Sequence, residues 1–498
     1  MVEATGLRMG SAAGRWVLLA TVLGSGIVMI DGTVVNVALP HIGDDLGSGF
    51  GGLQWIINAY TLSLASLILL GGALGDHFGR RRVFVIGVAW FALASLACGL
   101  ASTTEALIAA RAMQGVGGAL LTPGSLALIS ASFRGTDRAA AIGAWSGLGG
   151  IAAAVGPFVG GYLVEWSWRA VFLINLPLAG IVIAVTVLRV PESCDRTTPR
   201  GLDMSGAVLT ALGLGALTYG LTGLGNRGPT PDAVVSLVVG ALALTAFVIV
   251  ERRSRHPLIP LVLFSDRIFR VTNVMTLLIY GALGAAFLLL VLQLQTVAGF
   301  SPLAAGTALL PFTVVMLVFS ARAGVLAARI GPRLPMTIGP LIAAAGLMLM
   351  TRIGADASWV SDVLPAAAVF GAGMVLVVAP LTTAVLDSAP QNMAGAASGV
   401  NNAVARAGGL LAVAVLPGLA GISGADYADP AAFDIGFHRA VVISAALMVV
   451  ASMVAALGIH RRSTPLEHDD RIRVDECAHC AISGPPLHPA GGSDSAPN

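Results

Sequence analysis

The stretch VLGSGIVMIDGTVVNVALP, residues 22–40, is a nearly continuous apolar run that contains one carboxylate, the side chain of Asp31. A helix needs about 20 predominantly apolar residues to cross a bilayer, so this stretch predicts a membrane-spanning helix. An isolated acid inside such a helix costs roughly 2.5–3.5 kcal/mol on insertion scales. We therefore expect the Asp31 side chain to point into the protein, toward a cavity or a partner, and not toward lipid.

The composition of the whole chain indicates the same class of protein. Of its 498 residues, 56% are hydrophobic and 11% are charged, whereas a soluble domain carries about 25% charged residues. So few charges cannot cover a water-facing surface, and we predict an all-α integral membrane protein with 14 transmembrane helices. The predicted spans are 16–39, 53–74, 83–101, 105–129, 138–163, 170–189, 204–224, 232–250, 271–298, 303–327, 335–352, 362–386, 394–419 and 437–459.

The arginines are unevenly distributed between the predicted loops. All 28 basic residues are arginines, and with the N-terminus in the cytoplasm 22 of them fall in cytoplasmic segments, two fall within spans and four fall on the other side. Loops rich in positive charge stay in the cytoplasm during membrane insertion. We therefore expect both termini to be cytoplasmic, in a multi-pass protein of the cell (plasma or inner) membrane.

Two similar segments indicate an internal repeat. GALGDHFGRRRVF, residues 72–84, follows the second span, and GVLAARIGPRLPM, residues 324–336, follows the tenth. Both copies lie on the same side of the membrane, which is typical of two halves related by an axis along the membrane normal. The predicted domains are a cytoplasmic N-terminus at 1–15, a six-helix half at 16–190, two inserted helices at 204–250, a second six-helix half at 271–459, and a cytoplasmic tail at 460–498 that we expect to be disordered.

These motifs resemble those of a known family. The pattern GxxxDxxGRRR that begins at Gly72 is similar to the loop motif of the major facilitator superfamily. Four further stretches resemble its fourteen-helix drug:proton antiporter branch, the EmrB/QacA type. They are IDGTVVNVALP at 30–40, RAMQGVGGALLTP at 111–123, GGIAAAVGPFVGGYL at 149–163 and WRAVFLINLP at 168–177. The resemblance implies the major facilitator fold and transport by alternating access.

Asp31 and Arg111 are the predicted proton-coupling residues. An arginine inside a membrane span cannot lose its proton, so its charge needs a partner. Asp31 is the only acid near the middle of a span in the same half. Burial favours the neutral form of a carboxyl group and a nearby cation favours the charged form, so an acid balanced between them can gain and lose a proton. The alternative is a permanent ion pair that locks two helices together. The resemblance implies that the arginine serves proton coupling.

The loop motif is a predicted gate. A glycine at position 79 allows a tight turn, and the arginines also serve to fix the topology. The resemblance implies that Asp76 acts as a latch, which bridges to the other half when the cytoplasmic side is closed. The second copy of the motif has Ala328 at the matching position, so the acid is present in one copy only. The predicted latch residues are Gly72, Asp76, Gly79, Arg80 and Arg81.

The fifth span carries small residues at three- and four-residue steps. Such spacing lets helices approach closely, and Pro157 can bend the helix. Close packing alone would explain this pattern. The resemblance adds that the bent helix packs on a span of the other half and opposes leakage. The residues concerned are Gly149, Gly156, Pro157, Gly160 and Gly161.

Several polar or aromatic residues within spans are candidates for a substrate cavity. Aromatic side chains suit flat organic ligands, although each residue alone could equally serve packing. Arg406 lies one helical turn after Asn402 and could either line the cavity or cap a neighbouring helix. The candidate residues are Tyr60, Gln114, Trp145, Tyr280, Gln293, Asn402 and Arg406.

The function expected from these features is proton-coupled secondary active efflux of lipophilic compounds, as in a multidrug or antibiotic exporter. The tenth span has no Asp or Glu, whereas family members that take divalent drugs carry an acid there, so we expect neutral or monocationic substrates. The alternative is a dedicated exporter of one endogenous metabolite or lipid. We expect a monomer that contacts membrane lipids, a small-molecule substrate and protons, and no nucleic acid.

Neither an enzyme nor a cofactor is indicated. The sequence has no nucleophile–base constellation and no phosphate-binding loop. The pair Cys477 and Cys480 is a weak zinc signal because no second pair accompanies it. We therefore expect no metal and no cofactor, with a proton gradient as the energy source.

Overall fold

The computed structural model describes residues 7–194, 203–254, 257–390, 393–424 and 426–459. These residues form helices, without a β-strand among them, and one isolated bridge joins Leu7 to Phe133. Fourteen helices in the described ranges are long and apolar enough to cross a membrane, which confirms the predicted fold class and span count. The predicted tail at 460–498 lies outside the described residues.

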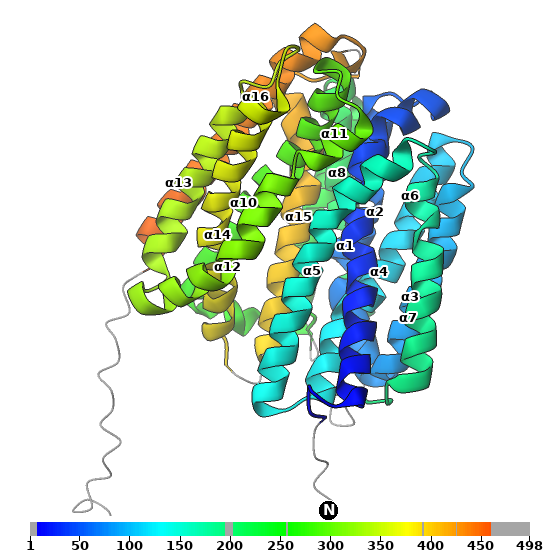
Figure 1. Ribbon diagram of the computed structural model, residues 1–498, viewed down its shortest axis with the longest axis vertical. Coiled ribbons are helices and arrows are strands. Elements are labelled where there is room, and N and C mark those ends of the chain that lie inside the picture. The colour runs from blue at the N-terminus through cyan, green and yellow to red at the C-terminus, as the bar shows by residue number, and fades with distance from the viewer. Residues whose placement is uncertain (1–6, 195–202, 255–256, 391–392, 425, 460–498) are drawn as a thin grey trace, which may run out of the picture. The chain divides into compact units, whose positions relative to one another are not determined.

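The first six spans come from the segment predicted as the first half (Figure 1). They are α1 (Ala12–Leu46), α2 (Phe50–Phe78), α3 (Arg80–Gly99), α4 (Thr104–Ser132), α5 (Gly135–Val164), and the consecutive pair α6 (Ala170–Leu173) and α7 (Asn175–Arg189). Two inserted spans follow, α8 (Met204–Arg227) and α9 (Pro231–Arg253).

The last six spans begin after a short helix, η1 (Leu261–Ser265). Three of these spans contain two consecutive helical elements, of which η2 and η3 are π-helical turns. The elements are α10 (Arg267–Leu292) with η2 (Gln293–Val297), α11 (Pro302–Thr307) with α12 (Leu310–Ile330), α13 (Arg333–Met350), η3 (Trp359–Val363) with α14 (Leu364–Asp387), α15 (Ala394–Ala420), η5 (Asp426–Ala428) and α16 (Pro430–Gly458).

The ends of the helices differ from those predicted because hydropathy marks the apolar part only. Helix α1 begins four residues before and ends seven residues after the predicted span 16–39. The Ser11 hydroxyl accepts a hydrogen bond from the N–H of Gly14, which caps the start of the helix. Gly47, at a φ of 61°, ends it in a left-handed conformation that favours glycine.

The predicted repeat is visible in the backbone. Gly79 joins α2 to α3 at a φ of 107°, and Gly331 joins α12 to α13 at a φ of 84°. Both values lie in a region that side chains rarely allow, so both turns require glycine. The start of α1, these two turns and the end of α16 lie at one end of the helices, which we call the basic end. It is the end predicted to be cytoplasmic, and the other is called the opposite end.

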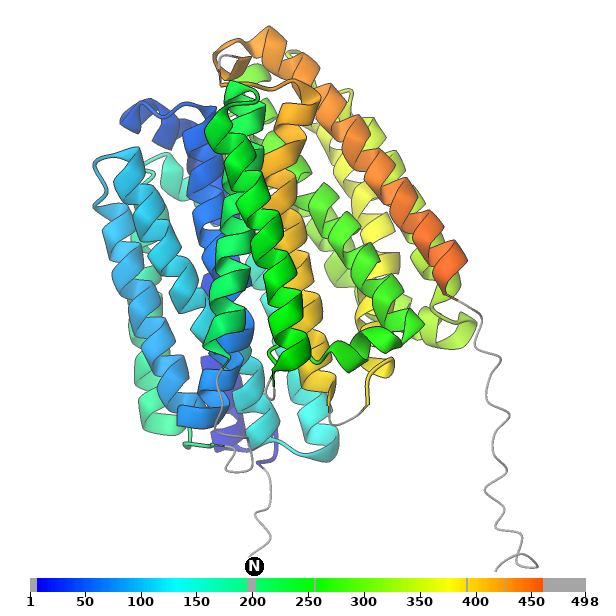
Figure 2. The same cartoon turned by 180° about the vertical axis from the view of Figure 1, so that it is seen from behind.

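The inserted helices lie where the two halves meet (Figure 2). Helix α8 packs against α2 of the first half and α15 of the second, and Gly225 meets Gly418 where α8 approaches α15. Helix α9 packs mainly on α8, and most of its side chains are exposed or half-buried, as expected for a lipid-facing helix.

The halves are bonded to each other at the opposite end. The side chain of Gln54 donates to the carbonyl of Val413 at 2.8 Å, and Gln295 donates to the carbonyl of Val37 at 3.0 Å. The ring of Phe50 stacks on that of Tyr427 with centroids 5.7 Å apart. Within the described residues, no hydrogen bond or ion pair joins the two halves at the basic end. The structure is therefore closed at the opposite end.

The close approach of α5 and α11 gives a test of this packing. A Cβ atom on Gly161 would lie 2.6 Å from the Cα atom of Leu303, so the backbones would have to separate. We expect Gly161→Val to destabilise the protein by about 1–3 kcal/mol, measured by thermal unfolding in detergent. Gly150→Val in the same helix is the control, because nothing lies within 4 Å of its Cβ position. Equal effects of both variants would contradict the packing described.

Candidate functional site

An ion pair is buried inside the first half. Arg111 on α4 reaches Asp31 on α1, with 2.5 Å between Nη1 and Oδ2. Asp31 is 0% exposed and Arg111 is 1% exposed. The pairing predicted from the sequence is therefore present in the structure, and neither water nor lipid reaches it in this conformation.

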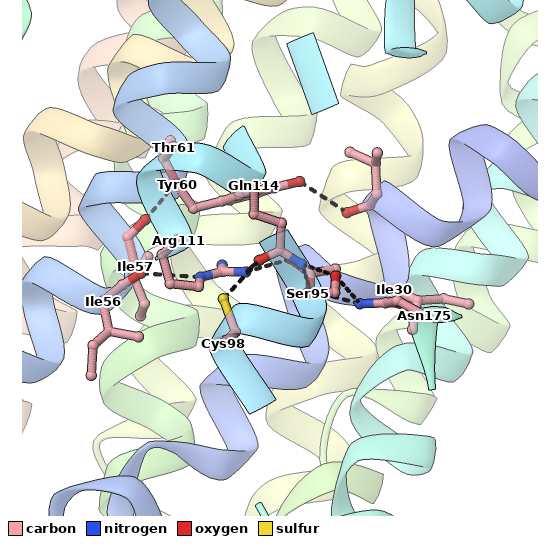
Figure 3. A network of polar contacts seen from close by, with 12 residues as sticks. Ile30, Ile56, Ile57, Tyr60, Thr61, Ser95, Cys98, Arg111, Gln114 and Asn175 are labelled. Carbon is pink, nitrogen blue, oxygen red and sulfur yellow. Dashed lines mark hydrogen bonds and ion pairs between the residues drawn. The ribbon is translucent and has the colours of Figure 1, made fainter. Parts of the chain in front are cut away.

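Two amide side chains, those of Gln114 and Asn175, which Figure 3 labels, complete the surroundings of the Asp31 carboxylate. The Gln114 amide donates to Oδ1 of Asp31 at 2.8 Å, and the Asn175 amide donates to the same atom at 3.1 Å. Both amides also donate to the hydroxyl of Ser95, at 2.7 and 3.2 Å. A buried charge is tolerated only when it is paired and hydrogen-bonded, and this carboxylate meets both conditions.

The guanidinium of Arg111 is held from several sides. It donates to the Gln114 side-chain carbonyl at 2.6 Å and to the backbone carbonyl of Ile56 at 3.3 Å. Its Cζ atom lies 4.2 Å from the centre of the Tyr60 ring and 5.7 Å from that of Phe172. Aromatic faces stabilise a desolvated cation by about 2 kcal/mol, so the site suits a permanently charged arginine.

The same geometry makes the pair sensitive to a proton. Protonation of Asp31 would remove the negative charge and leave the Arg111 cation in a buried site without a counter-ion. Such a site costs several kcal/mol, so the helices would be driven to rearrange. Every hydrogen-bond partner in this cluster belongs to the first half, on α1, α2, α3, α4 and α7. The arrangement is compatible with a proton switch and with a permanent lock.

Sequence reasoning missed two residues of this cluster and placed two others differently. Asn175 and Ser95 are both fully buried and were not singled out. Asn175 lies in the quoted stretch 168–177, where it is a neutral polar residue within an apolar run, and this was the available signal. Gln114 and Tyr60 were expected to line a cavity, but they are 0% and 3% exposed and surround the ion pair.

The predicted latch is bonded within its own half. The Asp76 carboxylate accepts from Arg80 at 2.8 Å, and it makes no bond to the second half in the described residues. Glu192, after α7, accepts the backbone N–H groups of Arg81 and Arg82 at 3.0 and 3.1 Å and so caps the start of α3. Glu192 was not predicted. The bridge across the halves, implied for the closed cytoplasmic side, is absent from this conformation.

The small residues of α5 face two different helices. Gly149 lies against Met29, Gly156 against Thr33 and Gly160 against Val34, all on α1. Gly161 lies against the backbone of Leu303, and the Pro157 carbonyl lies against Gly306, both on α11 of the second half. The helix therefore contacts a span of the other half, as the motif implied. Its role in opposing leakage stays a prediction.

The remaining cavity candidates do not form one group. Gln293 donates to the Ile353 carbonyl at 2.9 Å and to Asp434 at 2.5 Å, among helices of the second half at the opposite end. It is fully buried there and lines no cavity in this conformation, so its role in substrate binding stays a prediction. The Trp145 indole donates to the hydroxyl of Ser25 at 3.0 Å.

Three further candidates, on α10 and α15, are accessible. Tyr280 and Arg406 are half-buried, and Asn402 is exposed.

No metal site is formed by the described residues, among which no three His, Cys, Asp or Glu side chains come together. Cys98 is buried beside the ion-pair cluster, with 3.7 Å between its Sγ atom and Oε1 of Gln114. Cys194 is exposed. The predicted pair Cys477 and Cys480 lies outside the described residues.

Comparisons with known proteins identify the family. The chain belongs to the major facilitator superfamily, whose family model matches residues 21–413. It is 36% identical over 402 residues to the multidrug resistance protein Stp of Mycobacterium tuberculosis, covering 80% of this chain and 74% of that protein. It is also 36% identical over 404 residues to the tetracenomycin C resistance and export protein of Streptomyces glaucescens, with the same coverage.

The fold is shared with solved transporter structures. A bacterial homolog of the human lysosomal transporter Spinster, in an inward-facing and unoccupied conformation, has a TM-score of 0.63 at 17% identity. The match covers 90% of this chain and 97% of that chain. This chain is thus a multi-pass membrane protein of a transporter family, and its relatives include a multidrug resistance protein and a tetracenomycin C resistance and export protein. The family that the sequence motifs predicted is therefore confirmed.

The buried pair predicts an asymmetric effect of mutation. Arg111→Met leaves the Asp31 charge buried without a counter-ion, and we expect it to destabilise the protein by about 3–5 kcal/mol. The double variant Asp31→Asn/Arg111→Met should recover most of that loss, because neither charge remains. The measurement is thermal unfolding in detergent at neutral pH.

A second ion pair provides the control. Arg169 and Asp45 are 2.8 Å apart, but their side chains are 37% and 48% exposed. Asp45→Asn should leave the unfolding temperature nearly unchanged, because exposed pairs contribute little to stability. A double variant at the buried pair that is no more stable than Arg111→Met would contradict our account.

Proposed function

We propose that the protein is a proton-coupled secondary active exporter of lipophilic compounds. The observation that carries the proposal is the buried Asp31–Arg111 pair, a titratable group with a fixed counter-ion in the membrane interior. Ionisable residues at this depth are costly and mark proton or substrate pathways. The names of the relatives, which describe multidrug resistance and the export of tetracenomycin C, support export as the direction of transport.

The proposed cycle uses two conformations. With the basic end in the cytoplasm, as the arginine distribution predicts, the structure corresponds to a state closed toward the outside. In this state Asp31 is ionised and bonded to Arg111. A proton from outside reaches Asp31 in the other state, and its release to the cytoplasm restores the ion pair. Proton and substrate need only favour different states, so they do not have to share a site.

Two parts of the first half are proposed to control the cycle. Asp76 and Arg80 pair with each other in this state, and we propose that the pair opens when the cytoplasmic side closes, so that Asp76 bonds to the second half. The contact of Gly161 with Leu303 would hold the outside closed. These roles assign the gate to the basic end and the seal to the opposite end.

For the substrates we propose lipophilic compounds that are neutral or carry one positive charge. Helices α11 and α12 contain no Asp or Glu, so a second positive charge would find no counter-ion there. The second candidate function is export of one endogenous metabolite or lipid, and a competition panel in vesicles separates the two. We propose that the protein works as a monomer in the cell membrane, with both termini in the cytoplasm.

The coupling acid is tested by transport in everted membrane vesicles acidified inside. We expect Asp31→Asn to lower pH-driven accumulation of a drug by roughly tenfold or more, because coupling free energies of 1–3 kcal/mol correspond to about 5–150-fold. Exchange of labelled for unlabelled drug without a gradient should persist. Asp45→Asn is the control and should transport as the unmodified protein does. Normal pH-driven accumulation by Asp31→Asn would contradict the assignment.

The charge class is tested with two dyes of similar shape. We expect ethidium, with one positive charge, to be exported at least roughly tenfold faster than the bis-cationic propidium, because burying an unpaired second charge is costly. The rates are followed by the loss of dye fluorescence from energised cells. Equal rates for the two dyes would show that the predicted charge class is wrong.

A further inference from the structure

Arg406 is a cation without a partner. It lies on α15, it is half-buried, and it makes no hydrogen bond, ion pair or ring contact within the described residues. Arg111, the other arginine in the middle of a span, is bonded on every side. A charged group inside a membrane protein is costly and is retained where it has a task, so the free donors of Arg406 need an explanation.

The packing of α15 shows which way Arg406 faces. On a helix, residues 399, 406 and 413 share one face. Gly399 lies against Leu69 of α2, and the carbonyl of Val413 accepts a hydrogen bond from Gln54 of α2. Arg406 lies midway between these two contacts. Its side of α15 is therefore turned toward the first half.

Further donors surround this position. Tyr280, on α10, lies beside α15, because a Cβ atom on Gly409 would lie 3.8 Å from the backbone carbonyl of Tyr280. The Tyr280 hydroxyl makes no hydrogen bond in the described part of the chain. Asn402, one turn before Arg406, is exposed and its amide is also unpaired there. Its neighbour Asn401 instead donates to Thr276 on α10, at 2.8 Å.

Most polar atoms of this group are hydrogen-bond donors. A guanidinium carries five donors and no acceptor, and the Tyr280 hydroxyl and the Asn402 amide add further donors. No carboxylate in the described ranges pairs with Arg406, and Asp31 is fully buried and already bonded to Arg111. The aromatic side chain of Tyr280 is only half-buried. The group therefore offers donors and flat apolar surface to a molecule between the halves.

We infer that Arg406, Tyr280 and Asn402 form a subsite that binds the acceptor oxygens of the exported compound. The chemical class is a flat aromatic compound that carries carbonyl, quinone or hydroxyl oxygens. This inference rests on the proposed function and narrows it. Within the proposed substrates, oxygen-bearing compounds are bound best, and cations without such oxygens gain nothing from this subsite.

The preference follows from the geometry of the arginine. Its planar fork donates two parallel hydrogen bonds to two neighbouring oxygens, as in a hydroxyl group beside a quinone carbonyl. A hydrocarbon of the same shape would bury surface on the Tyr280 ring but would leave the donors unpaired. Leaving buried donors unpaired is penalised, so the subsite discriminates against the hydrocarbon.

The test compares equilibrium binding of two matched probes, 1-hydroxyanthraquinone and anthracene, to purified full-length protein. We expect the unmodified protein to bind the hydroxyanthraquinone at least roughly tenfold more tightly, which is the size of one or two hydrogen bonds to a charged donor. Arg406→Gln should lose this preference while anthracene binding changes less than about twofold. Arg406→Lys should keep part of it, because the charge remains but the fork is lost.

Two controls keep the outcomes distinct. Arg227→Gln removes an exposed arginine that pairs with Asp232 at 2.9 Å, and it should leave both affinities unchanged. Arg406→Gln should unfold at the same temperature as the unmodified protein or a higher one, because no bond in the described structure is lost. No preference in the unmodified protein, or an unchanged preference in Arg406→Gln, would overturn the inference.

The same binding experiment distinguishes a bound lipid from an exported compound. It also distinguishes failure of the subsite from failure of the proposed function. If anionic lipid at increasing mole fraction in nanodiscs displaces the hydroxyanthraquinone from the unmodified protein but not from Arg406→Gln, Arg406 binds lipid phosphate and the inference is overturned. Binding is measured without a proton gradient. A protein that binds as expected but shows no pH-driven transport would therefore refute the proposed function and leave the subsite standing.

Discussion

The structure depends on the burial of one carboxylate and one guanidinium in the middle of a membrane protein. Neither Asp31 nor Arg111 is tolerable alone at this depth, because an unpaired charge in a medium of low dielectric constant is costly. Their pairing fixes the rotation of α1 and α4 about their axes. Gln114, Asn175 and Ser95 then fix the geometry of the carboxylate, which brings α3 and α7 into the same cluster. A neutral polar residue at either charged position would remove this constraint.

Much of the architecture could be predicted from the sequence, and the reasons are physical. Hydropathy predicts the spans because a helix needs about 20 apolar residues to cross a bilayer. The repeated segment predicts the two halves because both copies contain a turn that requires glycine. The partner of Asp31 could be predicted because charges in spans are few. The neutral members of the cluster could not be predicted, since nothing in the sequence tells which helix an uncharged Asn or Ser in a span will contact.

The direction in which each side chain points around its helix axis accounts for most of the differences between the sequence predictions and the structure. Asn401 and Asn402 are adjacent in sequence, yet one is bonded to α10 and the other is exposed. Gln293 has the same hydropathy as Gln114, but it lies in a π-helical turn and bonds to Ile353, just after α13, and to Asp434 on α16, at the opposite end. Such differences depend on tertiary packing. The same holds for Glu192, whose capping role exists only because α7 ends beside the start of α3.

All hydrogen bonds to the Asp31 carboxylate come from helices of the first half, whereas Tyr280, Asn402 and Arg406 belong to the second. In the cycle that we propose, proton coupling and substrate recognition therefore belong to different halves and can change at different rates over evolutionary time. Under this proposal, substitutions in α10 and α15 would alter substrate recognition without contacting the residues proposed to bind the proton. A lineage of such proteins could therefore change the compounds that it recognises while the proposed proton-coupling residues stay the same.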